Sequence, residues 1–251
     1  MAQRLWTREE SIIVFNLYCR IPFKASSKNH PDVIKIANLI GRSPSAVNMK
    51  IGNFGSFDEN LNKKGIVGLT NVSKLDKEIF NEFSGNWDKL VYESELLIKK
   101  LSKTTFDSST EILPKGGEIS SVVKTRINQD FFRRTILTSY ASTCCITGIC
   151  APQLLIASHI KPWKNSSETE KTNPRNGLCL NALHDKAFDQ GLITILPDYR
   201  ITVSRYLKDV YDGDAIQRYF RVYENKQISL PEKFIPDKIY LEYHNDTIFQ
   251  R

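Results

Sequence analysis

The chain has 251 residues, of which 41% are hydrophobic and 10% aromatic, so it can form one large domain or two modest ones with a buried core. It contains neither a run of eighteen apolar residues nor a charged-then-apolar N-terminal segment, which argues against a membrane span and a secretory signal, and we expect a cytoplasmic protein. The formal net charge of +7 favours polyanionic partners, because cationic side chains release the counterions that surround a polyanion.

The first predicted helix begins after Thr7. Thr7 and Glu10 have the T-x-x-E spacing of a capping box, and the apolar-rich run SIIVFNLYCRIPF follows them. Farther along, a short amphipathic helix over residues 32–40 is expected to end at Gly41, and another to begin after Ser43 and Pro44. A helix, a tight turn and a second helix are the parts of a helix-turn-helix.

In a helix-turn-helix the second helix enters the major groove of DNA and its exposed side chains face the base edges. The residues expected to be exposed here, and therefore to bind DNA, are Arg42, Ser45, Asn48 and Lys50. The alternative is a small helical bundle that only packs against its neighbour.

A linker is predicted between two further helices. Residues 86–103 have an amphipathic pattern, whereas residues 106–117 are rich in polar residues, Pro and Gly and offer little apolar surface to bury. Beyond them, a basic helix carries apolar residues spaced to bury one side: Ile127, Phe131, Phe132 and Ile136. We therefore predict a helical DNA-binding domain over residues 1–105 and a second domain over residues 118–251.

Two of the four histidines lie in the stretch from Ser158 to Asp189. His159 follows the apolar run LLIAS, which predicts a short strand, and His184 lies in the helix-like run LCLNALHDKAF, with Asn176 between them. These three residues can converge on one phosphate, and hydrolysis of a phosphodiester needs a base and a cation. Taken singly, each has a structural alternative as a core histidine, a turn or a surface helix residue.

Several motifs follow one another in the second half of the chain. They are R-x-x-Q-x-x-F-R from Arg126, C-x-T-G from Cys145, LLIASHIKPW, NPRNGLCLNALHDKAFDQGL and a closing L-x-x-H that ends at His244. In this order they resemble the HNH endonuclease family, and more narrowly its branch in restriction endonucleases. The resemblance implies a ββα-metal fold, in which two strands carry the first histidine, a loop the asparagine and a helix a metal ligand. The expected fold class is therefore α+β, with an all-helical N-terminal domain that contains the helix-turn-helix-like segment.

The resemblance also implies roles for individual residues. His159 would be the general base, Asn176 would orient it, and His184 would be the third motif residue, a ligand of one divalent cation. The chemistry agrees, because an imidazole can take a proton from water near neutral pH and an amide can fix the ring through nearby backbone groups. Mg²⁺ or Mn²⁺ would suit the cation. Lys161 and Arg175 are expected to hold flanking phosphates, although a solvated basic rim has the same composition.

The chain departs from the family pattern in two ways. Ser158 stands where many HNH proteins place Asp, and a neutral hydroxyl is a weak metal ligand. Asp185 can replace or supplement His184 as a ligand, and the prediction ranks His184 first. The five cysteines form no CxxC pair, so we expect reduced, mostly buried thiols and no structural zinc. Packing of Ile146, Leu154, Leu178, Leu180 and Phe188 would have to supply the core instead.

These patterns together predict a metal-dependent endonuclease of restriction type that hydrolyses duplex DNA. One site per chain cuts one strand, so a homodimer is expected to cut both. Two alternatives remain: a DNA-binding regulator with an inactive HNH fold, which Ser158 favours, and an HNH-type ribonuclease or toxin.

Overall fold

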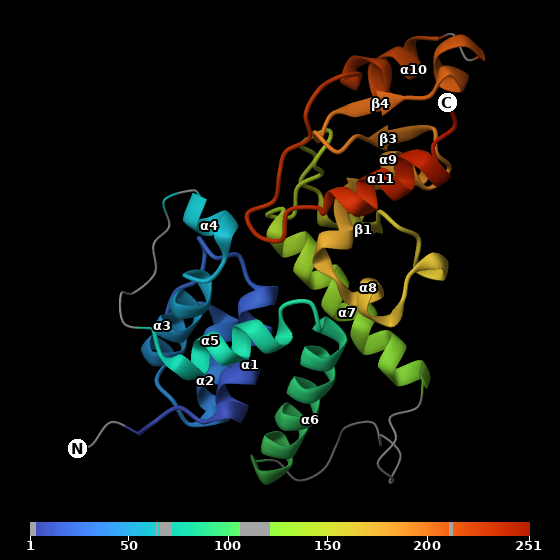
Figure 1. Ribbon diagram of the computed structural model, residues 1–251. Helices are drawn as coiled ribbons and strands as arrows, with labels where there is room; N and C mark the ends of the chain where they lie inside the picture. Colours follow the sequence, from blue (N-terminus) through green and yellow to red (C-terminus); the bar gives the residue numbers. More distant parts are fainter. Residues whose placement is uncertain (1–3, 64, 66–71, 106–120, 211–212) are drawn as a thin grey trace. The chain divides into compact units, whose positions relative to one another are not determined.

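The computed structural model describes residues 4–63, 65, 72–105, 121–210 and 213–251 (Figure 1). The chain divides into two compact units, Met1–Phe131 and Phe132–Arg251, and the boundary between them falls inside helix α7 (Ser121–Ser139). The predicted linker over residues 106–117 lies outside the described residues. The α+β prediction is confirmed, with helices in the first unit and the strands in the second.

Helices make up all the regular structure described in the first unit. Besides the start of α7, they are α1 (Arg8–Arg20), α2 (Pro31–Ile40), α3 (Pro44–Gly55), α4 (Glu59–Lys63), α5 (Lys74–Phe83) and α6 (Trp87–Thr105). α1 is the central helix, since α3, α5 and α6 all pack against it. Its buried face includes Ile13, Phe15 and Tyr18.

Local sequence signals explain where these helices begin and end. The capping box at the start of α1 is confirmed, because the Thr7 hydroxyl accepts from the Glu10 amide at 3.2 Å and the Glu10 carboxylate from the Thr7 amide at 3.1 Å. α2 ends at Gly41, whose φ of +65° is a conformation that favours glycine. The Ser43 hydroxyl then caps α3. The predicted helix-turn-helix-like segment is therefore present.

The second unit is built on one ββα element (Figure 1). Strand β1 (Leu155–His159) pairs antiparallel with β2 (Gly177–Asn181), so that His159 lies opposite Gly177. Helix α9 (Ala182–Asp189) follows at once, and the Asn181 side chain caps it by accepting from the amides of Leu183 and His184. The predicted strand at LLIAS and helix around His184 are confirmed.

Short elements surround this core. They are η1 (Pro152–Leu154), η2 (Trp163–Asn165), α8 (Glu168–Thr172), η3 (Pro174–Asn176), a second antiparallel pair β3 (Ile193–Ile195) and β4 (Ile201–Val203), η4 (Tyr206–Val210), α10 (Asp214–Tyr219), η5 (Arg221–Tyr223) and α11 (Lys238–Thr247). Within the described residues, no helix combines the length and apolarity that crossing a bilayer requires.

The core of the second unit forms where α7 and α9 meet the strands. Every residue of β2 is buried, and a β-carbon at Gly177 would collide with the side chains of Phe132 and Ile136 on α7. Of the predicted core, Leu178, Leu180 and Phe188 are fully buried and Ile146 packs against them half-buried.

One residue of that predicted core is wrong. Leu154 is 53% exposed, because it lies in the turn of η1 before the strand begins. The cysteines agree with the prediction, since all five are free thiols and only Cys150 is exposed.

Candidate functional site

A cavity of about 720 Å³ opens beside the ββα element. Its walls are formed by β1, the η2 turn, one face of α9 and helix α11. The polar side chains that line it are Ser158, His159, Lys164, Asn165, Asp185, Asp189, Gln190, Tyr243 and Thr247. It therefore brings together the predicted base and a residue of the predicted metal-binding helix.

The last residue of β1, His159, is held in one orientation. Its ring stacks on Phe132 at 3.8 Å between ring centroids and meets Trp163 edge-on at 5.4 Å. Its Nε2 lies 2.9 Å from the main-chain oxygen of Lys171. A carbonyl can only accept, so Nε2 carries the proton and the neutral ring keeps its lone pair on Nδ1. Among the described residues, nothing forms a hydrogen bond with Nδ1.

The surroundings of His159 also favour the neutral ring. Burial lowers the pKa of this imidazole from its usual 6.5, and the hydrogen bond to the Lys171 carbonyl opposes that effect without cancelling it. The neutral form therefore predominates at pH 7. An unprotonated Nδ1 at neutral pH is what a general base requires.

Asn176 is completely buried and braces the loop that follows β1. Its side-chain oxygen accepts from the Lys161 amide at 2.8 Å, and its side-chain nitrogen donates to the main-chain oxygens of Lys161 at 3.2 Å and Glu170 at 3.3 Å. The amide thus ties both ends of the loop whose Lys171 carbonyl holds His159. It makes no direct contact with the imidazole in these hydrogen bonds, so any influence on the base passes through the backbone.

Two carboxylates of α9, one helical turn apart, line the same cavity. Burial raises the pKa of Asp185, and the nearby Ser158 hydroxyl, which makes no hydrogen bond of ordinary geometry, opposes that shift. Asp189 is exposed as a residue, yet the protein atoms around its carboxylate raise its pKa by partial desolvation, and the charge of Asp185 raises it further. Among the described residues, no lysine or arginine forms an ion pair with either carboxylate.

His184 does not line the cavity, contrary to the prediction that it meets His159 there. It is buried on another side of α9, where Nε2 lies 2.8 Å from the main-chain oxygen of Tyr219 and Nδ1 lies 3.1 Å from the side-chain oxygen of Asn181. Successive residues of a helix point about 100° apart, and in α9 this rotation places Asp185 on the cavity and turns His184 away from it. Asp185, which the prediction ranked second, is the residue of this pair that lines the same cavity as His159.

The predicted exposure of Arg42 and Lys50 is wrong. The Arg42 guanidinium pairs with Glu10 at 2.7 Å and lies 4.4 Å from the centre of the Trp6 ring. Lys50 is completely buried in an ion pair with Asp76. Both cations are used inside the helical unit, since Arg42 shares the Glu10 carboxylate with Arg4 and Lys50 neutralises the buried Asp76 carboxylate.

The other residues predicted to bind DNA differ in exposure. Ser45 is exposed, whereas Asn48 is half-buried and accepts a hydrogen bond from the Ser26 hydroxyl at 2.7 Å. Lys161 pairs with both oxygens of Glu170, and Arg175 is exposed. Of the lysines beside the cavity, Lys164 lines it and is exposed.

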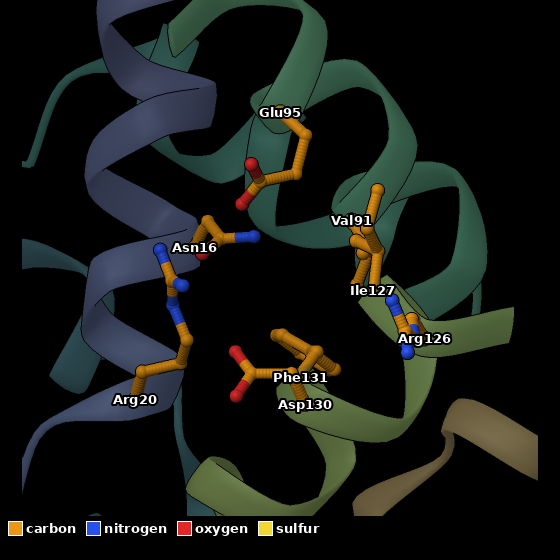
Figure 2. Close-up of a pocket in the computed structure, with 8 residues that line it drawn as sticks. All are labelled: Asn16, Arg20, Val91, Glu95, Arg126, Ile127, Asp130 and Phe131. Carbon is orange, nitrogen blue, oxygen red and sulfur yellow. The ribbon is translucent and has the colours of Figure 1, made fainter. Parts of the chain in front are cut away.

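A second cavity, of about 270 Å³, lies in the helical unit (Figure 2). Two arginines, two carboxylates and one amide line it beside apolar residues: Asn16, Arg20, Val91, Glu95, Arg126, Ile127, Asp130 and Phe131. The Asn16 amide donates to the Ser94 hydroxyl at 2.6 Å. None of the predicted site residues lies here. The R-x-x-Q-x-x-F-R motif contributes Arg126 to its lining, but the motif gave no sign of a cavity.

A comparison with protein families identifies part of the second unit. Residues 144–196 match the family model described as HNH endonuclease. The matched segment contains β1, β2 and α9, and with them His159, Asn176 and Asp185. No curated protein matches the chain.

Proposed function

We propose that this chain, whose residues 144–196 match the HNH endonuclease family model, is a metal-dependent enzyme that hydrolyses phosphodiester bonds in duplex DNA. The observation that carries the proposal is the free Nδ1 of His159 in a cavity that it shares with Asp185. A base and an anionic metal ligand on one cavity are the two groups that this hydrolysis needs from the protein.

His159 takes the proton of the attacking water on Nδ1. The ring then becomes a cation, and the Lys171 carbonyl opposite Nε2–H stabilises that charge. Stacking on Phe132 keeps the ring plane fixed while the proton moves. Asn176 acts as a positioning residue, because it anchors the loop that presents the carbonyl.

Asp185 is assigned as the metal ligand in place of His184. The described residues contain no group of three or more histidine, cysteine or acidic side chains close enough to hold a metal ion. This arrangement still fits Mg²⁺ or Mn²⁺, which bind through one or two carboxylates and complete their coordination with water and substrate phosphate. When bound, such a cation neutralises the scissile phosphate and helps the 3′ oxygen to leave.

Duplex DNA is the proposed substrate because the chain is basic and the cavity carries an exposed lysine. Lys164 on the cavity wall and Arg175 on the nearby surface are the proposed phosphate contacts. On α3, Ser45 and Asn48 remain the proposed base contacts, whereas Arg42 and Lys50 have structural roles. A homodimer of restriction type is proposed for cleavage of both strands.

The decisive experiment is incubation of supercoiled plasmid with the wild type and with His159→Ala in Mg²⁺ and in Mn²⁺. Wild type should nick or linearise the plasmid, whereas His159→Ala should bind it equally in a gel-shift assay and leave it supercoiled. Plasmid that is shifted but never cut by the wild type would instead identify a regulator. Preferential cleavage of a structured RNA would identify a ribonuclease.

The restriction role needs a separate measurement. Matched methylated and unmethylated DNA should be cut to different extents, and sequencing of the ends would give the site. The rate of double-strand cleavage should rise with protein concentration if a dimer is required. Equal cleavage of both DNA samples would refute the restriction role while leaving the nuclease activity intact.

A further inference from the structure

We propose that Asp189 is a second carboxylate ligand of the divalent cation, acting with Asp185 from the same face of α9. This inference rests on the proposed function, and it names the donor set of that site. The two residues are four apart in sequence, so their side chains lie one above the other along the helix. Both line the cavity that holds His159.

The placement of Asp189 is unfavourable without a cation. Like charges four residues apart repel each other on a helix, and Asp189 is also the last residue of α9, where the helix dipole disfavours a negative charge. In the nearby α8, by contrast, Glu168 pairs with Lys171 and Glu170 with Lys161. Among the described residues, no such partner exists for Asp185 or Asp189. A divalent cation between them would offset both the repulsion between the two carboxylates and the unfavourable effect of the helix dipole on Asp189.

Ser158 supplies an independent sign of a ligand at this position. It lies on β1 and lines the same cavity, its side chain is buried, and its hydroxyl makes no hydrogen bond of ordinary geometry, although it lies near enough to Asp185 to oppose the rise in the pKa of that carboxyl. A buried hydroxyl without a well-aligned partner is costly unless something binds it. The hydroxyl can offer an oxygen but no charge. Asp189 is the one carboxylate besides Asp185 on the cavity wall that the structure describes, so the second negative charge comes from Asp189.

The cavity also contains its own reporter of metal binding. Trp163 lines it, whereas the other two tryptophans, Trp6 and Trp87, belong to the helical unit. Excited tryptophan sensitises the emission of nearby Tb³⁺, a hard cation that binds to carboxylates. Tyr243 also lines the cavity and can sensitise the ion, so excitation is set at a wavelength that tryptophan absorbs and tyrosine does not. Under that excitation, Tb³⁺ titrated into the full chain should give sensitised emission from wild type and none from Trp163→Phe. Equal emission from Trp163→Phe would place the ion elsewhere and overturn the proposal.

The test compares Tb³⁺ affinity in Asp189→Asn, Asp185→Asn and a matched control, Glu242→Gln, which alters an exposed carboxylate of α11 that does not line the cavity. Each cavity variant should lose at least about tenfold in affinity, since even groups outside the first coordination shell typically contribute 10- to 100-fold. The control should bind like wild type, and Mg²⁺ or Mn²⁺ should compete with Tb³⁺. Wild-type affinity in Asp189→Asn would overturn the proposal.

Thermal unfolding separates loss of a ligand from loss of the fold. Without metal, Asp189→Asn should melt at the same temperature as wild type or higher, because it removes a repulsion. With Mn²⁺ the wild type should gain more in melting temperature than the variant, and an equal gain would overturn the proposal. Ion binding that depends on both carboxylates in a protein that cuts no nucleic acid would instead refute the proposed function and support this site.

Discussion

The second unit should lose stability in mild acid because of one buried imidazole. His244 on α11 is 1% exposed, its ring stacks on Phe188 at 3.7 Å between centroids, and Nε2 lies 3.0 Å from the Phe188 main-chain oxygen. Its Nδ1 lies 2.9 Å from the Thr194 hydroxyl. Both nitrogens are therefore used in joining α11 to α9 and β3. Protonation of this ring must disturb the packing of the helix that carries Asp185.

The size of the effect follows from the pKa of His244. Burial lowers this pKa from 6.5 to about 4, against the opposing hydrogen bond to the Phe188 carbonyl. The unfolded chain thus binds a proton at a higher pH than the folded chain does, so the stabilisation is complete above pH 6.5 and is lost as the pH falls toward 4. At about 1.4 kcal/mol per unit, the free energy of unfolding falls by ~3 kcal/mol in total and by ~2 kcal/mol at about pH 5.

Hydrogen exchange of the β2 amides measures this loss of stability in the second unit alone. Exchange is followed by mass spectrometry in the full chain at neutral pH and at about pH 5, with correction for the intrinsic rate. His244→Gln should be less stable at neutral pH but should lose much less between the two pH values. His30→Asn, which keeps a capping residue of α2 in the other unit, should leave the change in β2 as in wild type. An undiminished loss in His244→Gln would refute the reasoning.

Four further outcomes are expected. His159→Ala should lower the rate of plasmid nicking by about 10²- to 10⁴-fold with unchanged DNA affinity, and a gel shift weakened in parallel would contradict a role in catalysis alone. Because burial lowers the pKa of His159 below its usual 6.5, the ring stays neutral until the pH falls below that value. The rate of nicking in a pH–rate series should therefore decrease only below pH 6.5. A decrease centred above pH 6.5 would count against His159 as the base. Gly177→Ala should lower the free energy of unfolding by about 1–3 kcal/mol in a urea titration, because its β-carbon would meet Phe132 and Ile136, and an unchanged midpoint would show that α7 can shift. Lys50→Met should lower the free energy of unfolding by about 3–5 kcal/mol, because it leaves the buried Asp76 carboxylate without its cation. Lys50→Met combined with Asp76→Leu should recover most of that loss. No recovery would mean that the loss of the ion pair is not the cause of the destabilisation.

Elements defined by neighbouring residues could be predicted from the sequence. The capping box of Thr7 and Glu10, the end of α2 at Gly41 and the strand before His159 all depend on contacts within a few positions. The family motifs also placed His159 and Asn176 in the correct elements, because in a short strand or turn the position of a residue in the sequence largely fixes its place in the element. Local chemistry thus sufficed for the ββα element.

The choice between His184 and Asp185 could not be made in this way. A shift of one residue along α9 turns the side chain by about 100°, and the start of the helix at Asn181 fixes that phase. The groups that bury His184, at Tyr219 and Phe220, lie more than thirty residues away in sequence. The sequence of α9 does not show which face of the helix such a distant segment will cover.

Arg42 and Lys50 were misjudged for a related reason. Long cationic side chains in a turn or on a short helix are usually solvated, and the partners of these two, Glu10 and Asp76, lie 32 and 26 residues away. Only the fold shows that these carboxylates are buried beside them. A helix-turn-helix pattern therefore predicted the helices of this segment but not the composition of its exposed surface.

The proton on His159 is fixed by a main-chain carbonyl, and this has a consequence for how the domain can change in evolution. No replacement of the Lys171 side chain removes that oxygen, so position 171 can vary without altering the tautomer of the His159 ring. Asn176 has no such freedom, although it never touches the imidazole, because its amide sets the path that the main chain takes on its way to residue 171.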